Sequence, residues 1–132
     1  MGSILYAEDS YLMREVISEE LKERFPDVSK EVFSCGCDLE KRLNSGEPFA
    51  VALVDNTMPP GPQGIEIIEN HRKKFPNSTF ILYSASVELA EYAKKVGVMF
   101  MDKCADDSNL VFHEIRKALE KYNLQKTSIA AS

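Results

Sequence analysis

The feature that most constrains the fold of this chain is a rhythm in which short apolar runs alternate five times with segments of helical period. Apolar residues at three-to-four spacing form one face of a helix, and an unbroken apolar run is typical of a strand covered on both faces. The expected strands cover residues 4–7, 31–35, 49–54, 79–83 and 98–101. The expected helices cover residues 12–25, 38–43, 64–75, 87–96 and 108–122.

Prolines and glycines mark the ends of four of these helices. Pro26 and Pro76 stop the first and third, whereas Gly46 and Gly97 lie just beyond the second and fourth, where a left-handed residue commonly ends a helix. The side chains expected to cap helix starts are Asp9 or Ser10, Asp38 and Ser86.

Strict alternation of strands and helices predicts an α/β fold, a doubly wound five-stranded parallel sheet with helices on both faces. A chain of 132 residues corresponds to one domain. We expect this domain to cover residues 1–124 and residues 125–132 to form a flexible tail. In such a fold, ligands bind in the crevice outside the carboxyl ends of the strands.

Composition and charge narrow the class of function. The net charge is −5 and no basic stretch is longer than Arg72–Lys74, so we expect no direct nucleic-acid binding. The longest apolar runs reach only six residues, far short of the roughly 20 that a membrane span needs. Glu8 and Asp9 interrupt the apolar start, so we expect no signal peptide. With three cysteines and no export signal, we expect reduced thiols and a cytoplasmic location.

Polar side chains follow four of the five expected strands. The fold gathers carboxylates, a hydroxyl and an ammonium at one edge of the sheet, where crowded carboxylates repel one another or bind a cation. Mg²⁺ is the cation that suits oxygen ligands of this kind. Capping of the next helix is the alternative role for any one of these residues. The residues that follow these four strands are Glu8 and Asp9, then Asp55, then Ser84 and the small Ala85, then Asp102 and Lys103.

These motifs, in this order, resemble the receiver domain of two-component response regulators, which has a flavodoxin-like fold. The resemblance extends from about Ile4 to Tyr122 and rests on four segments. It implies a phosphorylation-controlled switch, not a conventional enzyme, in which Asp55 accepts a phosphoryl group from a histidine kinase or phosphotransfer protein, using Mg²⁺. The segments are 4–10, 53–59, 83–85 and 100–103.

The resemblance also implies a role for each matching residue. Asp9 would be a direct Mg²⁺ ligand together with Asp55, Thr57 would give its backbone carbonyl, and Glu8 would act through water. Lys103 would neutralise the phosphoryl group, as suits a reaction that depends on positioning and charge. The remaining matches are Ser84 as the switch hydroxyl, Phe100 as the aromatic that changes rotamer, and Ala85 and Asn56 in the phosphoryl pocket.

Three departures from the family pattern stand out. Glu8 replaces the commoner aspartate, and the proline-rich loop at residues 58–64 is one residue longer than usual. Cys104 occupies the place of a proline that follows the lysine through a cis bond. Because a cis bond before a non-proline residue costs about 3–4 kcal/mol, we expect a trans bond and a reshaped loop after the last strand.

Single residues bear on other possible functions of the chain. An aspartyl-phosphate phosphatase or mutase needs a second carboxylate two residues after the nucleophile, where this chain has Thr57. A receiver-like protein-interaction module without phosphorylation remains the alternative. The Cys35-Gly36-Cys37 segment is expected to be structural, and His71 and His113 are expected to be solvated. The face formed by residues 87–101 and the last helix suits either a partner or plain packing.

Overall fold

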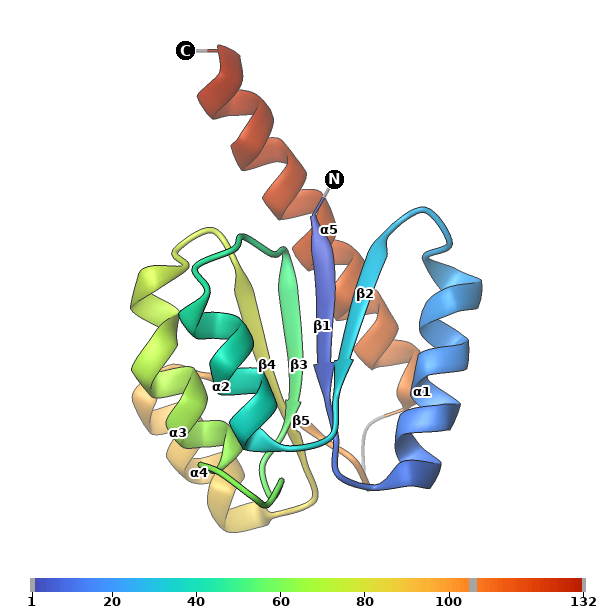
Figure 1. The fold of residues 1–132 in the computed structure, drawn as a ribbon, viewed down its shortest axis with the longest axis vertical. Coiled ribbons are helices and arrows are strands. Elements are labelled where there is room, and N and C mark those ends of the chain that lie inside the picture. Colours follow the sequence, from blue (N-terminus) through green and yellow to red (C-terminus); the bar gives the residue numbers. More distant parts are fainter. Residues whose placement is uncertain (1, 105–106, 132) are drawn as a thin grey trace.

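The computed structural model describes residues 2–104 and 107–131, with side chains as far as residue 125. One five-stranded sheet forms the centre, with all neighbouring strands parallel and in the order β2-β1-β3-β4-β5 (Figure 1). The doubly wound α/β fold predicted from the sequence is therefore confirmed. The strands are β1 (Ser3–Ala7), β2 (Ser29–Phe33), β3 (Val51–Asp55), β4 (Thr79–Ser84) and β5 (Met99–Asp102). The helices are α1 (Tyr11–Arg24), α2 (Gly36–Asn44), α3 (Gly64–His71), the short η1 (Arg72–Lys74), α4 (Val87–Val96) and α5 (Ser108–Ala131).

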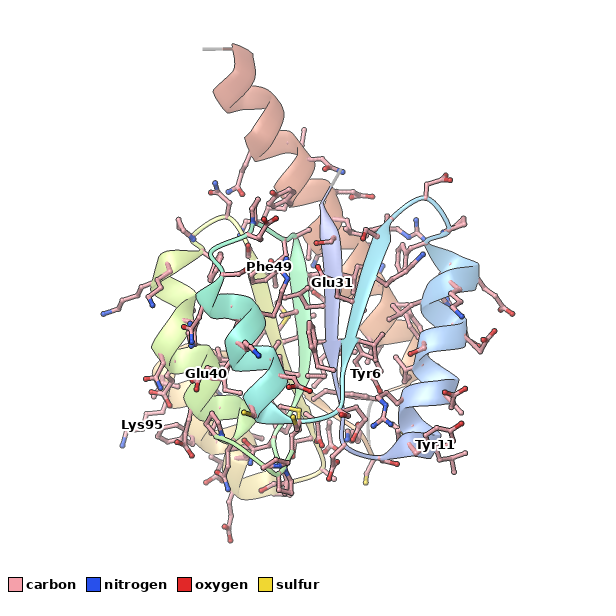
Figure 2. The ribbon with its side chains drawn as sticks, in the orientation of Figure 1. Tyr6, Tyr11, Glu31, Glu40, Phe49 and Lys95 are labelled. Carbon is pink, nitrogen blue, oxygen red and sulfur yellow. The ribbon has the colours of Figure 1, made fainter. Side chains whose placement is uncertain are left out.

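The helices form two layers around two apolar cores. Side chains at alternate strand positions, such as Tyr6 and Leu53, pack with α1 and α5, and their neighbours Leu5 and Ala52 pack with α2, α3 and α4. In Figure 1, α5 crosses behind the sheet and α2 lies in front of it. Tyr6 is almost fully buried, whereas Tyr11 projects into solvent from the start of α1 (Figure 2). Burial on both faces explains the unbroken apolar runs of the central strands.

The start of α2 differs from the sequence prediction. The expected cap, Asp38, is wrong: the helix begins at Gly36, and the Cys35 thiol accepts a hydrogen bond from the Asp38 N–H at 3.4 Å. The N–H groups of Gly36 and Cys37 donate to carbonyls of Met58 and Pro60 in the loop after β3. That loop thus satisfies first-turn donors that α2 cannot satisfy itself, and β2 ends two residues before the expected Cys35.

The last helix is longer than expected. It begins at Ser108 as predicted but continues past Leu124 to Ala131, beyond the body of the sheet (Figure 1). The segment after Leu124 contains no Pro or Gly and several good helix formers, so nothing in it stops the helix. The expected tail includes Ser132, which lies outside the described residues, and its flexibility stays a prediction.

Other helix ends agree with the sequence. Ser10 and Ser86 cap α1 and α4 by accepting hydrogen bonds from main-chain N–H groups three residues ahead. Gly46 and Gly97 both adopt positive φ beyond α2 and α4, as predicted. The expected third helix is shorter, because α3 ends at His71 and η1 follows.

One histidine prediction is wrong. His71 is only 4% exposed, and its Nε2 lies 3.5 Å from a Glu40 carboxylate oxygen of α2. It lies three and four residues after the buried Ile68 and Ile67, so helical geometry places it on the same inward face. His113 is exposed, as expected. Among the described residues, no helix has the length and apolar character needed to cross a membrane.

Candidate functional site

An acidic turn at the end of β1 forms one wall of the site. Glu8 continues the pairing with β2 through its N–H, which donates to the Phe33 carbonyl at 3.0 Å. The Glu8 side chain is only 1% exposed, and its Oε2 accepts a hydrogen bond from the Ser10 N–H. Asp9, by contrast, is exposed. The turn therefore presents one buried and one open carboxylate at the carboxyl edge of the sheet.

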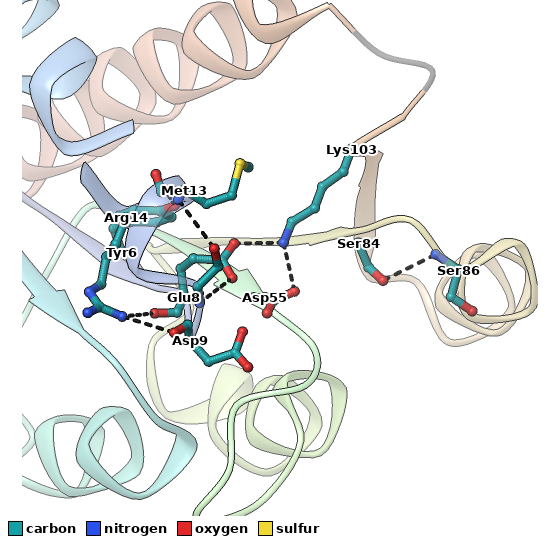
Figure 3. A network of polar contacts seen from close by, with 10 residues as sticks. Tyr6, Glu8, Asp9, Met13, Arg14, Asp55, Ser84, Ser86 and Lys103 are labelled. Atoms are coloured by element: carbon teal, nitrogen blue, oxygen red, sulfur yellow. Dashed lines mark hydrogen bonds and ion pairs between the residues drawn. The ribbon is translucent and has the colours of Figure 1, made fainter. Parts of the chain in front are cut away.

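Arg14 holds this acidic turn from the first turns of α1. Its Nη1 donates to the main-chain carbonyl of Glu8 at 2.9 Å and to that of Asp9 at 3.2 Å (Figure 3). Two hydrogen bonds from one planar guanidinium restrict the orientation of both peptide groups. Arg14 is not among the site residues predicted from the sequence. The sequence offers one signal for Arg14: it lies six residues after Glu8, in the helix that follows the acidic turn.

Lys103 bridges two buried carboxylates, Glu8 directly after β1 and Asp55 at the end of β3. Lys103 Nζ lies 2.6 Å from Glu8 Oε1 and 3.0 Å from Asp55 Oδ1 (Figure 3). The side chains of Lys103 and Asp55 are 19% and 12% exposed. Lys103 Nζ also lies 5.5 Å from the centre of the Tyr83 ring, within the range of a cation–π contact. The prediction that Glu8, Asp55 and Lys103 converge at the strand ends is confirmed in its geometry.

The loop after β5 allows this reach without a cis bond. The Lys103–Cys104 bond is not among the cis peptide bonds of the described residues, which confirms the expected trans bond. The Lys103 N–H donates to the Ser84 carbonyl at 3.1 Å, which carries the pairing of β4 and β5 one residue further. The Cys104 N–H donates to Asp102 Oδ1 at 2.8 Å. The expected reshaping of the loop concerns residues 105–106, which lie outside the described residues.

The close approach of α3 to β3 positions Asp55. A Cβ atom on Gly64 would collide with the Asp55 carbonyl oxygen, so the first residue of α3 must be glycine for the helix to lie this close. Asn56 completes the junction: its carbonyl accepts from the Gly64 N–H at 2.7 Å, and its Oδ1 accepts from the Ile65 N–H at 3.1 Å. Asn56 thus caps α3, in place of Gln63, which forms no side-chain cap.

Burial, together with neighbouring charges, changes three pKa values at this site. Burial raises the pKa of the Asp55 carboxyl to about 7, opposed by the Lys103 hydrogen bond and reinforced by the charge of Glu8. Burial lowers the pKa of Lys103, but hydrogen bonds to Glu8 and Asp55 more than offset this, so that pKa is above its usual value. Burial, and then the Glu8 charge, raise the pKa of Tyr6. One ammonium therefore leaves negative charge uncompensated.

The donor set of the pocket fits a divalent cation. Glu8, Asp9 and Asp55 each offer one carboxylate oxygen, and these oxygens lie within 4.8 Å of one another. Mg²⁺ takes oxygen ligands and is usually bound by one or two carboxylates while keeping several waters. The uncompensated charge of the pocket is of the sign that a cation would balance. The residues present therefore fit magnesium.

The remaining predicted residues lie at the same edge but outside the polar network. Ser84 is 9% exposed, and its hydroxyl accepts a hydrogen bond from the Ser86 N–H at 3.3 Å (Figure 3). Within the described residues, this hydroxyl has no bond to Asp55. Thr57 and Ala85 are exposed. Phe100 is half-buried against the core that contains α2, α3 and α4.

Solved structures with a similar fold include several receiver domains. A structure named adenylate cyclase, from Rhodopirellula baltica, matches with a TM-score of 0.78 and 24% identity over 98% of this chain and 96% of that one. Response regulator TrrA from Thermotoga maritima, in complex with Mg²⁺ and BeF, matches at 0.75 and 24% over 89% and 99%. A CheY-like receiver domain protein from Methanospirillum hungatei matches at 0.74 and 20% over 93% and 98%.

These likenesses confirm the fold that the sequence resemblance implied. The chain has the receiver fold, with the same five-stranded parallel sheet and five main helices. At these identities the likeness establishes the fold and not the activity. No protein-family model matches the chain. No curated protein matches it either.

Proposed function

From this fold and its acidic pocket, we propose that the chain is a phosphoaccepting receiver domain. Asp55 takes a phosphoryl group from a phosphohistidine of a histidine kinase or phosphotransfer protein. The observation that carries the proposal is the Lys103 ammonium bonded to both Glu8 and Asp55 at the strand ends. The Thermotoga relative was solved with Mg²⁺ and BeF, which supports the same chemistry here.

The proposed transfer requires little covalent work from the protein. A carboxylate oxygen of Asp55 forms a bond to phosphorus, and the phosphorus–nitrogen bond breaks, leaving its electron pair on the donor imidazole. A carboxylate and a phosphoryl group repel, and Lys103 reduces this repulsion because its ammonium already lies 3.0 Å from Asp55 Oδ1. Arg14 fixes the acidic turn beside the reacting carboxylate, so less reorganisation accompanies the transfer.

Four residues would hold the cation. Asp9 and Asp55 would bind Mg²⁺ directly, Thr57 would offer its backbone carbonyl, and Glu8 would act through water, since both Glu8 oxygens already accept hydrogen bonds. The ion, when bound, supplies positive charge at the phosphoryl oxygens and keeps Asp55 ionised. The positive charge of the cation would favour the ionised form of Asp55, because burial raises the pKa of this carboxyl to about 7.

Ser84 and Phe100 would convert phosphorylation into a change of surface. The Ser84 hydroxyl would leave the Ser86 N–H and donate to a phosphoryl oxygen, in space that the small Ala85 leaves free. Phe100, which is only half-buried, would then turn inward. One charge-assisted hydrogen bond contributes about 1.5–3 kcal/mol, roughly a ten- to hundredfold population shift. The surface around α4, β5 and α5 would present this change to a downstream protein.

The proposal also covers the bounds of the domain and its location in the cell. Residues 1–124 would form the receiver domain and 125–132 its tail. We place it in the cytoplasm, where it would meet a kinase, and assign it no catalysis beyond its own phosphorylation and dephosphorylation.

Intact-mass spectrometry tests the proposal. Acetyl phosphate with MgCl₂ should add one phosphoryl group to the wild type and none to Asp55→Asn. Asp38→Asn, which removes an exposed carboxylate in the first turn of α2, is the matched control and should be modified normally. Absence of the adduct in the wild type with Mg²⁺ present would refute the proposal and favour the interaction module that works without phosphorylation.

A further inference from the structure

A hollow lies between the end of α1 and the first turns of α5, away from the acidic pocket. Its volume is about 240 Å³, below the roughly 300–1,000 Å³ of sites for drug-sized ligands. Four of its residues lie on α5 at spacings of three, four and seven, which places them on one helix face. The lining residues are Arg24, Asn109, Phe112, His113 and Arg116.

Two arginines of this hollow are held by aromatic rings. The Arg24 guanidinium carbon lies 4.5 Å from the centre of the Phe112 ring, and that of Arg116 lies 5.0 Å from the Phe25 ring. Both rings are buried, so each guanidinium has a fixed apolar surface to stack on. Stacking restricts a flexible side chain before any ligand binds, and less conformational freedom is then lost on binding.

The polar groups in the hollow are mostly hydrogen-bond donors. Arg24 uses its Nε on Glu20 at 2.9 Å and its Nη2 on Asn109 Oδ1 at 2.8 Å, which leaves three of its five N–H donors. Because the Asn109 oxygen already accepts, the amide nitrogen remains as a donor. Arg116 has no ion-pair partner in the described part of the chain.

The lining of the hollow favours an anion, although carboxylates lie nearby. No carboxylate lines the hollow, although Glu20 pairs with the outer edge of Arg24. An adjoining hollow of about 270 Å³ shares both arginines and includes Asp27 and Glu120. In a chain with a net charge of −5, two oriented guanidiniums form a local concentration of positive charge. Guanidinium forks match the oxygens of phosphate groups.

We propose that this hollow binds a phosphate group, either as free phosphate or in a small phosphomonoester. Arg24 and Arg116 would donate to its oxygens from two sides, with Asn109 and His113 completing the donors. The site is distinct from the acidic pocket because Arg24 ends α1 while Glu8 and Asp9 precede its start, about 20 Å apart along a helix of 14 residues. The proposal does not depend on phosphorylation of Asp55.

Amide chemical shifts of the full chain test the site, measured with EDTA present to keep Mg²⁺ from the acidic pocket. Inorganic phosphate, O-phosphoserine and AMP are titrated separately against NaCl at equal ionic strength. We expect saturable shifts at Asn109, His113 and Arg116. Similar affinities for the three compounds would indicate that the oxyanion alone is recognised, and tighter binding of one would identify the source of the phosphate.

Matched variants of α5 make the result decisive. Arg116→Gln should weaken binding about tenfold, the lower end of what one charge-assisted hydrogen bond contributes. Lys117→Gln removes one positive charge from the same helix at a side chain that is 60% exposed and outside the hollow, and should change affinity less than twofold. Equal losses in both variants, or shifts that NaCl reproduces, would overturn the proposal.

Discussion

Replacing Asp55 with asparagine should stabilise the fold at neutral pH. The pKa of this carboxyl is raised from 3.8 to about 7 by burial, and Glu8 adds to the effect. Between those values the unfolded chain has released its proton while the folded chain still binds it, so the free energy of unfolding falls as pH rises. This loss of free energy of unfolding is absent below pH 3.8 and complete above about pH 7. Asp55→Asn removes the charge and keeps the shape.

The size of the effect follows from the same pKa. At about 1.4 kcal/mol per pH unit, the full interval corresponds to roughly 4 kcal/mol. Solvent screening at the pocket mouth reduces that value. The favourable contact between Asp55 and Lys103 is already included in it, because that contact opposes the rise of the pKa. We therefore expect a gain of about 2 kcal/mol at pH 8, declining toward zero near pH 4.

Urea unfolding at several pH values measures this directly, since a shift of midpoint at constant slope reports stability. Mg²⁺ supplies a second arm: it should stabilise the wild type by about 2.7 kcal/mol at a hundredfold excess over its Kd and Asp55→Asn much less. If the variant is no more stable at pH 8 than the wild type, the Lys103 pair outweighs burial and the electrostatic reasoning is wrong.

Three further outcomes follow from the site and the loop beside it. Ser84→Ala should still accept phosphate but lose most beryllofluoride-induced amide shifts around Phe100; a full wild-type pattern would contradict the switch. Asp9→Asn should weaken Mg²⁺ binding, followed by tyrosine fluorescence, more than Glu8→Gln, because both Glu8 oxygens are already hydrogen-bonded; equal losses would make Glu8 a direct ligand. Gly61→Ala should cost about 1–3 kcal/mol in urea unfolding, because φ is +112° there; an unchanged midpoint would refute the strain.

The parts of the fold that the sequence predicted best are those with strong local signals. Strands β3 and β4 each contain an apolar run of four residues. Helix α4 has both a serine cap and a glycine stop, so its bounds were predicted to the residue. The start of α2 was predicted wrongly because its donors bond to carbonyls of Met58 and Pro60, and sequence spacing alone does not reveal such long-range contacts.

The site divides in the same way. Parallel strands bring their carboxyl ends to one edge, so the convergence of Glu8, Asp55 and Lys103 follows from topology. Arg14 was missed because its partners are main-chain carbonyls, which leave no mark on residue identity. His71 was mispredicted because its charged neighbours in sequence hid its place on the apolar face of α3, although the spacing from Ile67 and Ile68 contained the information.

Localising the phosphoryl group tests the central claim most directly. After treatment with acetyl phosphate and Mg²⁺, borohydride reduction converts an aspartyl phosphate to homoserine, which peptide mass spectrometry can assign to a residue. We expect homoserine at Asp55 alone, and none when Mg²⁺ is chelated. Conversion at another carboxylate, or an unmodified Asp55 in a chain that carries the adduct, would contradict it.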